Sequence, residues 1–195
     1  MSAMIRAATE VFIEAGFVGA RMGDIADRAR VAVQTVYFTF HTKAELLQAC
    51  FDFAVLGPER RPPMEQAFFA DLLAARSGRA ALAAFVRGNT AILNRAAAIK
   101  EVAASARHEP DAVSVVARSE RLRREGLAHV VGVLADRFSL RAGLTRRDAT
   151  DLLLMLSSDA TYLTLRSYGW SEKRYVEWLT ETLTEQLLGR RGRRA

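Results

Sequence analysis

The sequence predicts an all-α protein in which a small N-terminal three-helix domain precedes a larger helical domain, with about nine helices in total. Half of the 195 residues are hydrophobic and only four are proline, which favours helices packed around a core. Apolar residues recur at helical spacings, and no alternating run of useful length indicates a β-strand. Gly57-Pro58 and Pro62-Pro63 mark a boundary, so we divide the chain into domains 1–56 and 57–195.

The individual helices are predicted from apolar spacing and from residues that begin or end helices. Glycine is expected to end three of them, at Gly16, Gly169 and Gly189. Thr145 with Asp148 is expected to cap the start of the penultimate helix. In chain order the predicted helices span about 3–15, 22–29, 33–39, 43–56, 64–75, 79–97, the adjoining 98–107, 110–137, 145–166 and 171–188.

Two of these helices, 22–29 and 33–39, are joined by the short connection Ala29-Arg30-Val31. Two helices joined by a turn of three or four residues form a helix-turn-helix, whose second helix enters the major groove of DNA. The N-terminal domain is therefore predicted to be a helix-turn-helix domain that binds DNA. Its expected core positions are Ile25, Ala26, Ala29, Val31, Val36 and Phe40.

A further helix start follows the motif directly, because Thr42-Lys43-Ala44-Glu45 has the form of a capping box. Residues 21–47 as a whole resemble the DNA-binding domain of the TetR family of transcriptional regulators. The similarity extends from about Ile5 to about Ala54, and beyond residue 56 only the helical layout resembles the family. It is carried by Ile25-Ala26, Val31, Thr35-Val36-Tyr37, Phe40, Lys43 and Glu45-Leu46-Leu47.

Four positions depart from the pattern of that family. Arg30 stands where the turn usually carries glycine, so it must adopt positive φ or reshape the turn. Ala32 replaces a serine, which leaves the second helix without a side-chain cap. Arg21 stands where serine or threonine usually opens the first helix, and Thr39 stands where histidine is frequent.

The resemblance implies a set of DNA contacts. Gln34 is suited to pair with adenine N6 and N7, and the Thr35 methyl to pack on a thymine methyl; the alternative for Gln34 is a solvated surface residue. Tyr37 and Lys43 match the family's phosphate contacts, and a helix N-terminus beside a cation suits phosphate. The expected set is Arg21, Gly23, Val33, Gln34, Thr35, Tyr37, Phe38, Thr39 and Lys43.

Charge contributes little to this interpretation, although the whole chain has a net charge of +6. Residues 1–56 hold five basic and six acidic side chains, so the predicted DNA-binding domain is about neutral. Much of the excess lies in the tail Arg190-Arg191-Gly192-Arg193-Arg194, which is expected to be solvated or to make a nonspecific phosphate contact. The prediction of DNA binding therefore depends on the motif.

The last two predicted helices carry apolar stripes, which have two interpretations: core within one chain, or an interface between two copies. The resemblance favours a four-helix interface in a homodimer, which would hold two recognition helices about 34–36 Å apart to read a palindrome. The first stripe is Ala149, Leu152, Leu156, Ala160 and Leu163, and the second is Val176, Leu179, Leu183 and Leu187.

The resemblance also implies a small-molecule inducer bound between about 60 and 168, and apolar helices favour an apolar or amphipathic one. The candidate ligand-binding residues are Phe68, Phe69, Phe85, Met155 and Tyr162, any of which could equally be ordinary core. The expected function is thus a ligand-responsive repressor that binds a palindromic operator in double-stranded DNA as a homodimer. The alternative is a helical ligand-binding or interaction module that has lost specific DNA binding.

Other classes of function find little support in the sequence. No phosphate-binding glycine loop, nucleophile elbow or distinctive pair of carboxylates indicates an enzyme or a cofactor. The single Cys50 excludes an intrachain disulfide, and His108 and His129 have no metal-ligand spacing, so no metal site is expected. No apolar run approaches the length of a membrane span and no signal peptide is evident, which predicts a cytoplasmic protein.

Overall fold

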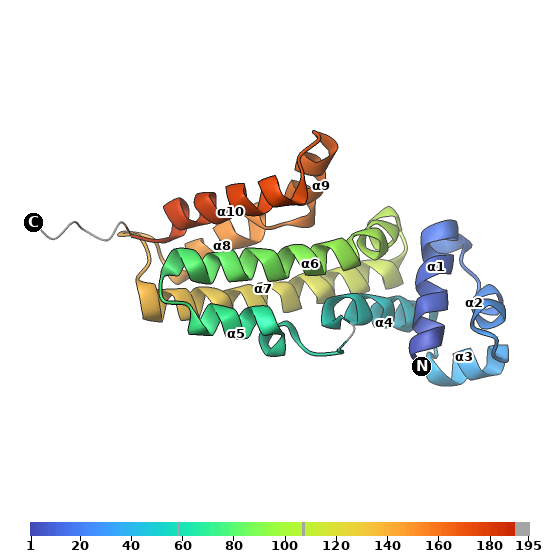
Figure 1. Cartoon of the computed structure of the whole chain (residues 1–195). Helices are drawn as coiled ribbons and strands as arrows, with labels where there is room; N and C mark the ends of the chain where they lie inside the picture. The colour runs from blue at the N-terminus through green and yellow to red at the C-terminus, as the bar shows by residue number, and fades with distance from the viewer. Residues whose placement is uncertain (58, 107, 190–195) are drawn as a thin grey trace, which may run out of the picture. The chain divides into compact units, whose positions relative to one another are not determined.

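The chain is all-α in the computed structural model, which describes residues 1–57, 59–106 and 108–189 (Figure 1). The only pairing of extended backbone in this part of the chain is an isolated bridge between Leu140 and Leu188. Pro58 and the arginine tail Arg190–Arg194 lie outside the described residues. The helices are α1 (Ser2–Gly19), α2 (Met22–Ala29), α3 (Val33–Thr39), α4 (Lys43–Leu56), the 3-10 turn η1 (Pro63–Glu65), α5 (Ala67–Ala74), α6 (Gly78–Ser105), α7 (Pro110–Phe138), α8 (Arg146–Leu156), α9 (Asp159–Ser167) and α10 (Glu172–Leu187).

Three predicted helices differ from the structure, whereas the predicted break at Gly16 is present: Gly16 has φ 69° and interrupts the helical backbone of α1, which resumes as far as Gly19. The predicted helix 64–75 is divided into η1 and α5, because Gln66 between them is extended, with φ −77° and ψ 155°. The two adjoining patterns 79–97 and 98–107 form the single helix α6, since the alanine-rich junction contains no glycine or proline. The predicted helix 145–166 is broken into α8 and α9, because the Ser158 hydroxyl accepts a hydrogen bond from the Thr161 N–H and starts a new helix.

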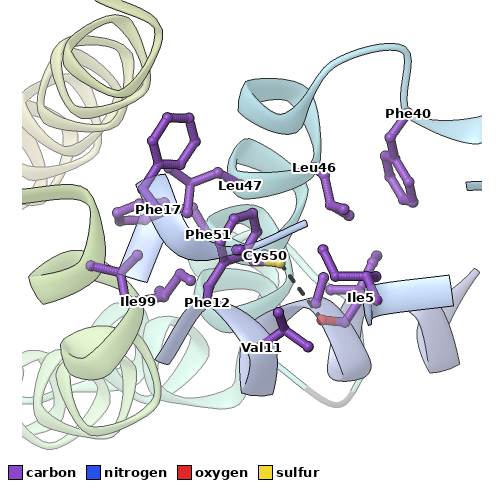
Figure 2. Packing of buried hydrophobic residues seen from close by; sticks show 14 of the residues in the cluster. Ile5, Val11, Phe12, Phe17, Phe40, Leu46, Leu47, Cys50, Phe51 and Ile99 are labelled. Carbon is purple, nitrogen blue, oxygen red and sulfur yellow. Dashed lines mark hydrogen bonds between the residues drawn. The ribbon is translucent and has the colours of Figure 1, made fainter. Parts of the chain in front are cut away.

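The described helices form two compact units, and each has its own apolar core. The first unit comprises Met1–Arg60 and Asn94–Arg121, so the C-terminal part of α6 packs with the N-terminal helices. Figure 2 shows its core, where Phe12, Leu47 and Ile99 are almost completely buried. The division into domains 1–56 and 57–195 stays a prediction, because close packing and independent folding are separate properties.

Cys50 illustrates how closely the first core is packed. Its side chain is buried, and the Sγ atom donates a hydrogen bond of 3.6 Å to the Ile5 carbonyl oxygen across the core (Figure 2). Burial raises the pKa of the thiol to about 11, since an apolar environment disfavours the thiolate. Cys50 is therefore a core residue and is protonated at neutral pH.

The second unit comprises Arg61–Leu93 and Leu122–Ala195. Figure 1 shows α10 running along the first half of α6, and Arg79 of α6 pairs with Glu181 of α10. α5 approaches α6 so closely that the Phe68 ring occupies the space that a Cβ atom on Gly88 would fill. α5 is also held to α7, because the Arg137 guanidinium donates to the Ala75 carbonyl at 2.9 Å.

The second predicted stripe belongs to this core. Leu179, Leu183 and Leu187 are completely buried within the single chain, and Val176 packs against them. Of the two interpretations of this stripe, the structure supports intrachain core, since every fourth residue of α10 faces the chain's own helices. These three leucines are thus not available to a second copy.

Candidate nucleic-acid interface

The turn between α2 and α3 keeps the helix-turn-helix geometry without glycine. Arg30 adopts the left-handed conformation, with φ 55° and ψ 47°, which is the first of the two outcomes expected for this position. Its N–H donates to the Asp27 carbonyl, and the Val31 N–H donates to the Ala26 carbonyl at 3.0 Å. This pair of bonds is a Schellman motif, which satisfies the last carbonyls of α2 and turns Val31 onto the core.

α3 has a buried face and an exposed face. Val36 is completely buried, as is most of Phe40 directly after the helix, so the prediction that both are core residues is confirmed. The opposite face carries Gln34 and Thr35, which are exposed, and Phe38, which is 86% exposed. The exposed residues follow one another at i, i+1 and i+4, the spacing of one side of a helix.

The remaining predicted contact residues lie around this face. Tyr37 is 50% exposed, whereas Val33 and Thr39 are half-buried at the two ends of α3. Arg21 is exposed directly before α2, and Gly23 has open space where a Cβ atom would lie. The structure therefore brings the predicted residues of α3 together on one short helix and leaves those of α2 at its start.

As expected from Arg21 and Ala32, neither α2 nor α3 has a side-chain hydrogen bond at its N-terminus. α3 also lacks acidic and basic side chains over its whole length. Its exposed face therefore offers one amide, one hydroxyl and an apolar ring.

Lys43 lies at the start of α4 and is held by the end of α1. Its Nζ donates to the carbonyl oxygens of Val18 at 3.2 Å and of Ala20 at 3.3 Å, and it lies 4.7 Å from the centre of the Phe17 ring. Residues 18–20 have turned after the Gly16 kink, so their carbonyls point toward the cation. Lys43 thus fixes the first turn of α4 against α1.

The predicted capping box before α4 forms in half. The Thr42 hydroxyl accepts a hydrogen bond of 3.0 Å from the Glu45 N–H, as expected. The Glu45 carboxylate instead accepts from the N–H of His41, one residue earlier than predicted, at 3.1 Å. The same carboxylate also lies 3.3 Å from Nδ1 of the His41 ring. Glu45 therefore contacts the segment between α3 and α4 as well as the start of α4.

One of the basic side chains in this region is neutralised within the protein. Arg28 pairs with Glu14 at 2.7 Å and lies 3.9 Å from Glu10. The hydrogen bond from Arg28 holds the pKa of the Glu14 carboxyl below its ordinary value, and Glu14 in turn raises the pKa of Arg28. Arg28 therefore contributes to the contact between α1 and α2 and adds little positive potential to the exposed face of α3.

Arg95 of α6 donates hydrogen bonds to the C-terminal end of α4. Arg95 donates from Nε to the Ala54 carbonyl at 2.9 Å and from its guanidinium to the Val55 carbonyl at 3.5 Å. Helix ends leave such carbonyls without intrahelical partners, so Arg95 acts as a cap supplied by another helix. The guanidinium lies against Gly57, which has φ 71° and ends α4.

The candidate ligand-binding residues fall into two groups. Phe69, Phe85 and Tyr162 are buried in the second core and Phe68 packs against it, so these four share one apolar interior. Met155 is 59% exposed on α8 and does not reach that interior.

Three polar side chains in the second unit, those of Asn89, Arg123 and Tyr175, were missed by the sequence analysis. Asn89 donates to the Ser157 carbonyl at 3.1 Å, and Arg123 donates to the same oxygen at 2.8 Å. The Tyr175 ring meets the Tyr162 ring edge-on with centroids 4.8 Å apart, and the Tyr175 hydroxyl is buried without a hydrogen-bond partner. Asn89 occupies a core position of α6 among apolar residues, which is the sequence signal that could have identified this cluster.

The described residues offer neither a cluster of metal-binding side chains nor a membrane-spanning helix. They contain no group of three or more histidine, cysteine, aspartate or glutamate residues placed to hold a metal ion. Among the same residues, no helix has both the length and the apolar character needed to cross a membrane.

Fold and interface together define a class: an all-helical protein with an N-terminal helix-turn-helix and a separate helical core. Residues 4–50 match the family described as bacterial regulatory proteins, tetR family. Residues 4–50 therefore resemble the TetR family, and the whole chain has a fold similar to that of solved transcriptional regulators. No curated protein sequence matches the chain.

Three solved structures show the extent of the fold similarity. The regulator FadR of Bacillus subtilis, in complex with stearoyl-CoA, is 18% identical with a TM-score of 0.68, covering 93% of this chain and 96% of FadR. NalD of Pseudomonas aeruginosa, the secondary repressor of the MexAB-OprM multidrug efflux pump, is 19% identical with a TM-score of 0.70, covering 96% and 94%. A Mesorhizobium loti protein described as a TetR-family transcriptional regulator is 21% identical with a TM-score of 0.69, covering 96% of each chain.

Proposed function

We propose that this protein is a ligand-responsive repressor that binds a palindromic DNA operator as a homodimer. The observation that carries the proposal is the exposed face of α3, which presents Gln34, Thr35 and Phe38 from a helix-turn-helix whose other face is buried. Exposed polar residues are ordinary on a surface helix, but the 86% exposed ring of Phe38 is an apolar group that folding does not use. A recognition helix presents such a combination of polar and apolar groups to the bases.

The proposed DNA contacts divide into base and backbone contacts. Gln34 and Thr35 face the major groove, where an amide can pair with adenine and a methyl group can pack on thymine. Tyr37 and Lys43 contact phosphates. The Lys43 ammonium has three N–H donors and gives two of them to the carbonyls of Val18 and Ala20, which leaves one for a phosphate oxygen. Lys43 therefore combines positioning of α4 with phosphate binding.

The homodimer is assigned to outward-facing apolar side chains, since the leucines of α10 are used inside the chain. Met155 of α8, Leu163 of α9 and Tyr168 after α9 are exposed by 59%, 44% and 73%.

Met155→Glu is expected to give monomers in sedimentation, with the free energy of unfolding little changed. Leu73→Glu, at a 46% exposed position of α5, is the matched control and should remain dimeric. A Met155→Glu dimer of unchanged stability would assign the interface to another surface.

The proposed inducer binds in the second core beside Tyr175. An aromatic and aliphatic interior with one unpartnered hydroxyl favours an apolar molecule that carries a hydrogen-bonding group. α6 supplies the route to DNA, because the same uninterrupted helix carries Phe85 in the second core and Arg95, which caps α4. A ligand that shifts α6 would move α4 and with it the recognition helices. By linkage, DNA must then weaken ligand binding by the same factor.

The test is DNA binding measured by fluorescence with the promoter region next to the protein's own gene, at low and moderate salt. Lys43→Ala should weaken binding to all sequences and lower the salt slope by about one per half-site, since it removes one phosphate contact from each protomer. Gln34→Ala should relax the base preference at one position in each half-site, at a cost of about 1–3 kcal/mol.

The neutral charge of residues 1–56 favours the second candidate, a ligand-binding module without specific DNA binding. Equal, weak affinity for promoter and unrelated DNA would establish that candidate and contradict the repressor. A candidate inducer should also bind free protein more tightly than the DNA complex. Equal affinities would overturn the proposed linkage between ligand and operator.

A further inference from the structure

Phe38 is the most exposed of the large apolar side chains on α3, at 86%. It follows Thr35 by three positions and Gln34 by four, so it projects from the same side of α3 as the two residues proposed to contact bases. Val33, Val36 and Phe40 lie on the opposite side, where Val36 and Phe40 are buried. Phe38 therefore faces whatever partner α3 meets.

The chemistry of this face is unusual for one that contacts DNA. It carries no arginine or lysine, the side chains that pair with the O6 and N7 acceptors of guanine. Its largest group is an aromatic ring, which can bury apolar area only against an apolar part of the groove. In the major groove of DNA that part is the 5-methyl group of thymine.

We propose that Phe38 determines sequence specificity by packing on a thymine 5-methyl group, so that each half-site is read mainly at A·T pairs. The inference rests on the proposed function and states which bases the interface prefers. Gln34 reads an adenine on this face, the Thr35 methyl and the Phe38 ring read thymine methyl groups, and guanine has no cationic partner on α3. The operator is accordingly expected to contain an A·T-rich centre in each half-site.

The experiment begins by selecting bound sequences from a random DNA duplex library with the full-length protein. Each thymine of the selected half-site is then replaced in turn by deoxyuridine, which removes only the 5-methyl group and keeps the base pair. Two thymines of the half-site should respond, one contacted by Thr35 and one by Phe38. At the Phe38 thymine the wild-type protein should lose affinity by about fourfold when one half-site carries deoxyuridine, and by about sixteenfold when both do, as expected for one buried methyl group per half-site. Phe38→Ala should bind the thymine and deoxyuridine duplexes equally at that position.

The variant also separates direct contact from DNA shape. A methyl group can change the stiffness of DNA, but that effect would weaken binding of Phe38→Ala as much as of wild type. Leu73→Ala, which truncates another exposed apolar side chain, should keep the wild-type response to deoxyuridine. An unchanged affinity for every deoxyuridine duplex, or a full loss retained in Phe38→Ala at every responsive thymine, would overturn the role of Phe38 alone. Failure to enrich any sequence would overturn the proposed function itself and this inference with it.

Discussion

α3 and α10 are both amphipathic helices, yet they use their apolar side chains in opposite ways. α10 turns Leu179, Leu183 and Leu187 completely into the core of the second unit. α3 buries one side chain completely, Val36, and leaves Phe38 exposed. Burial of apolar surface is the main favourable term in folding, so α10 contributes to stability while the outer face of α3 contributes little. Apolar surface that is not used for folding is available to a partner. On the helix-turn-helix, the exposed Phe38 side chain of α3 is such a surface.

The largest expected effect compares one residue from each helix. Leu183→Ala should lower the free energy of unfolding by about 2–5 kcal/mol, because it leaves a cavity in a closed core. Phe38→Ala should change it by less than about 0.5 kcal/mol, since little of that side chain is buried. Urea denaturation followed by circular dichroism measures both. Similar losses of unfolding free energy in the two variants would contradict the different roles assigned to the apolar side chains of α3 and α10.

The pH dependence of the unfolding free energy tests the core of the first unit, against which α3 packs. Burial raises the pKa of Cys50 from 9.0 to about 11, so its contribution to stability is complete below pH 9 and is lost as the pH rises through 11. A shift of this size corresponds to about 2–3 kcal/mol. Urea unfolding measured across this range should show the loss, and Cys50→Ala should show a shallower dependence on pH. An identical pH dependence in the variant would contradict the assignment to the thiol.

A smaller effect is expected at Tyr175, the first buried residue of α10. Its hydroxyl is buried without a partner, and a buried polar group in that state destabilises the fold. Tyr175→Phe should therefore raise the free energy of unfolding by about 1 kcal/mol and lower the affinity for the inducer. Thermal unfolding and ligand titration measure the two quantities. A clear destabilisation would mean that the hydroxyl is satisfied, for example by a bound water molecule.

The smallest effect is expected in the turn before α3. Arg30 has φ 55°, which glycine adopts without strain, so Arg30→Gly should stabilise the protein by about 0.5–1 kcal/mol. Arg30→Ala keeps a Cβ atom in the same conformation and should stay within about 0.5 kcal/mol of wild type. Differential scanning calorimetry of the two variants provides the comparison. Equal stabilities of the glycine and alanine variants would show that the turn carries no strain.

The helix-turn-helix could be predicted from the sequence because its determinants are local. The spacing of apolar residues in α2 and α3 and the short connection between them fix which residues become buried, and Val36 and Phe40 are buried as expected. For Arg30 the sequence left two possibilities, a positive φ or a reshaped turn, because a short turn of this kind needs a left-handed residue; the structure has the positive φ. Local backbone geometry leaves few alternatives over such a short segment.

The longer-range features could not be predicted in the same way. The leucine stripe of α10 has the same spacing whether it packs inside one chain or against a second copy, so only the tertiary structure separates these cases. The break between α8 and α9 has a local cause in the Ser158 cap. The apolar spacing continues across this break, so it predicted a single helix. The proximity of Asn89 and Arg123 to Ser157 depends on the packing of three helices, which no spacing in the sequence reveals.

The uncapped start of α3 has a consequence for its motions. A helix of seven residues is too short to be stable by itself, and Ala32 supplies no side chain to bond its first amides. Its backbone amides should therefore exchange with solvent through local opening, well before those of α10, which require disruption of the second core. If α3 binds DNA as proposed, the bound DNA would slow this exchange, and the loss of local opening would add an entropic penalty to binding.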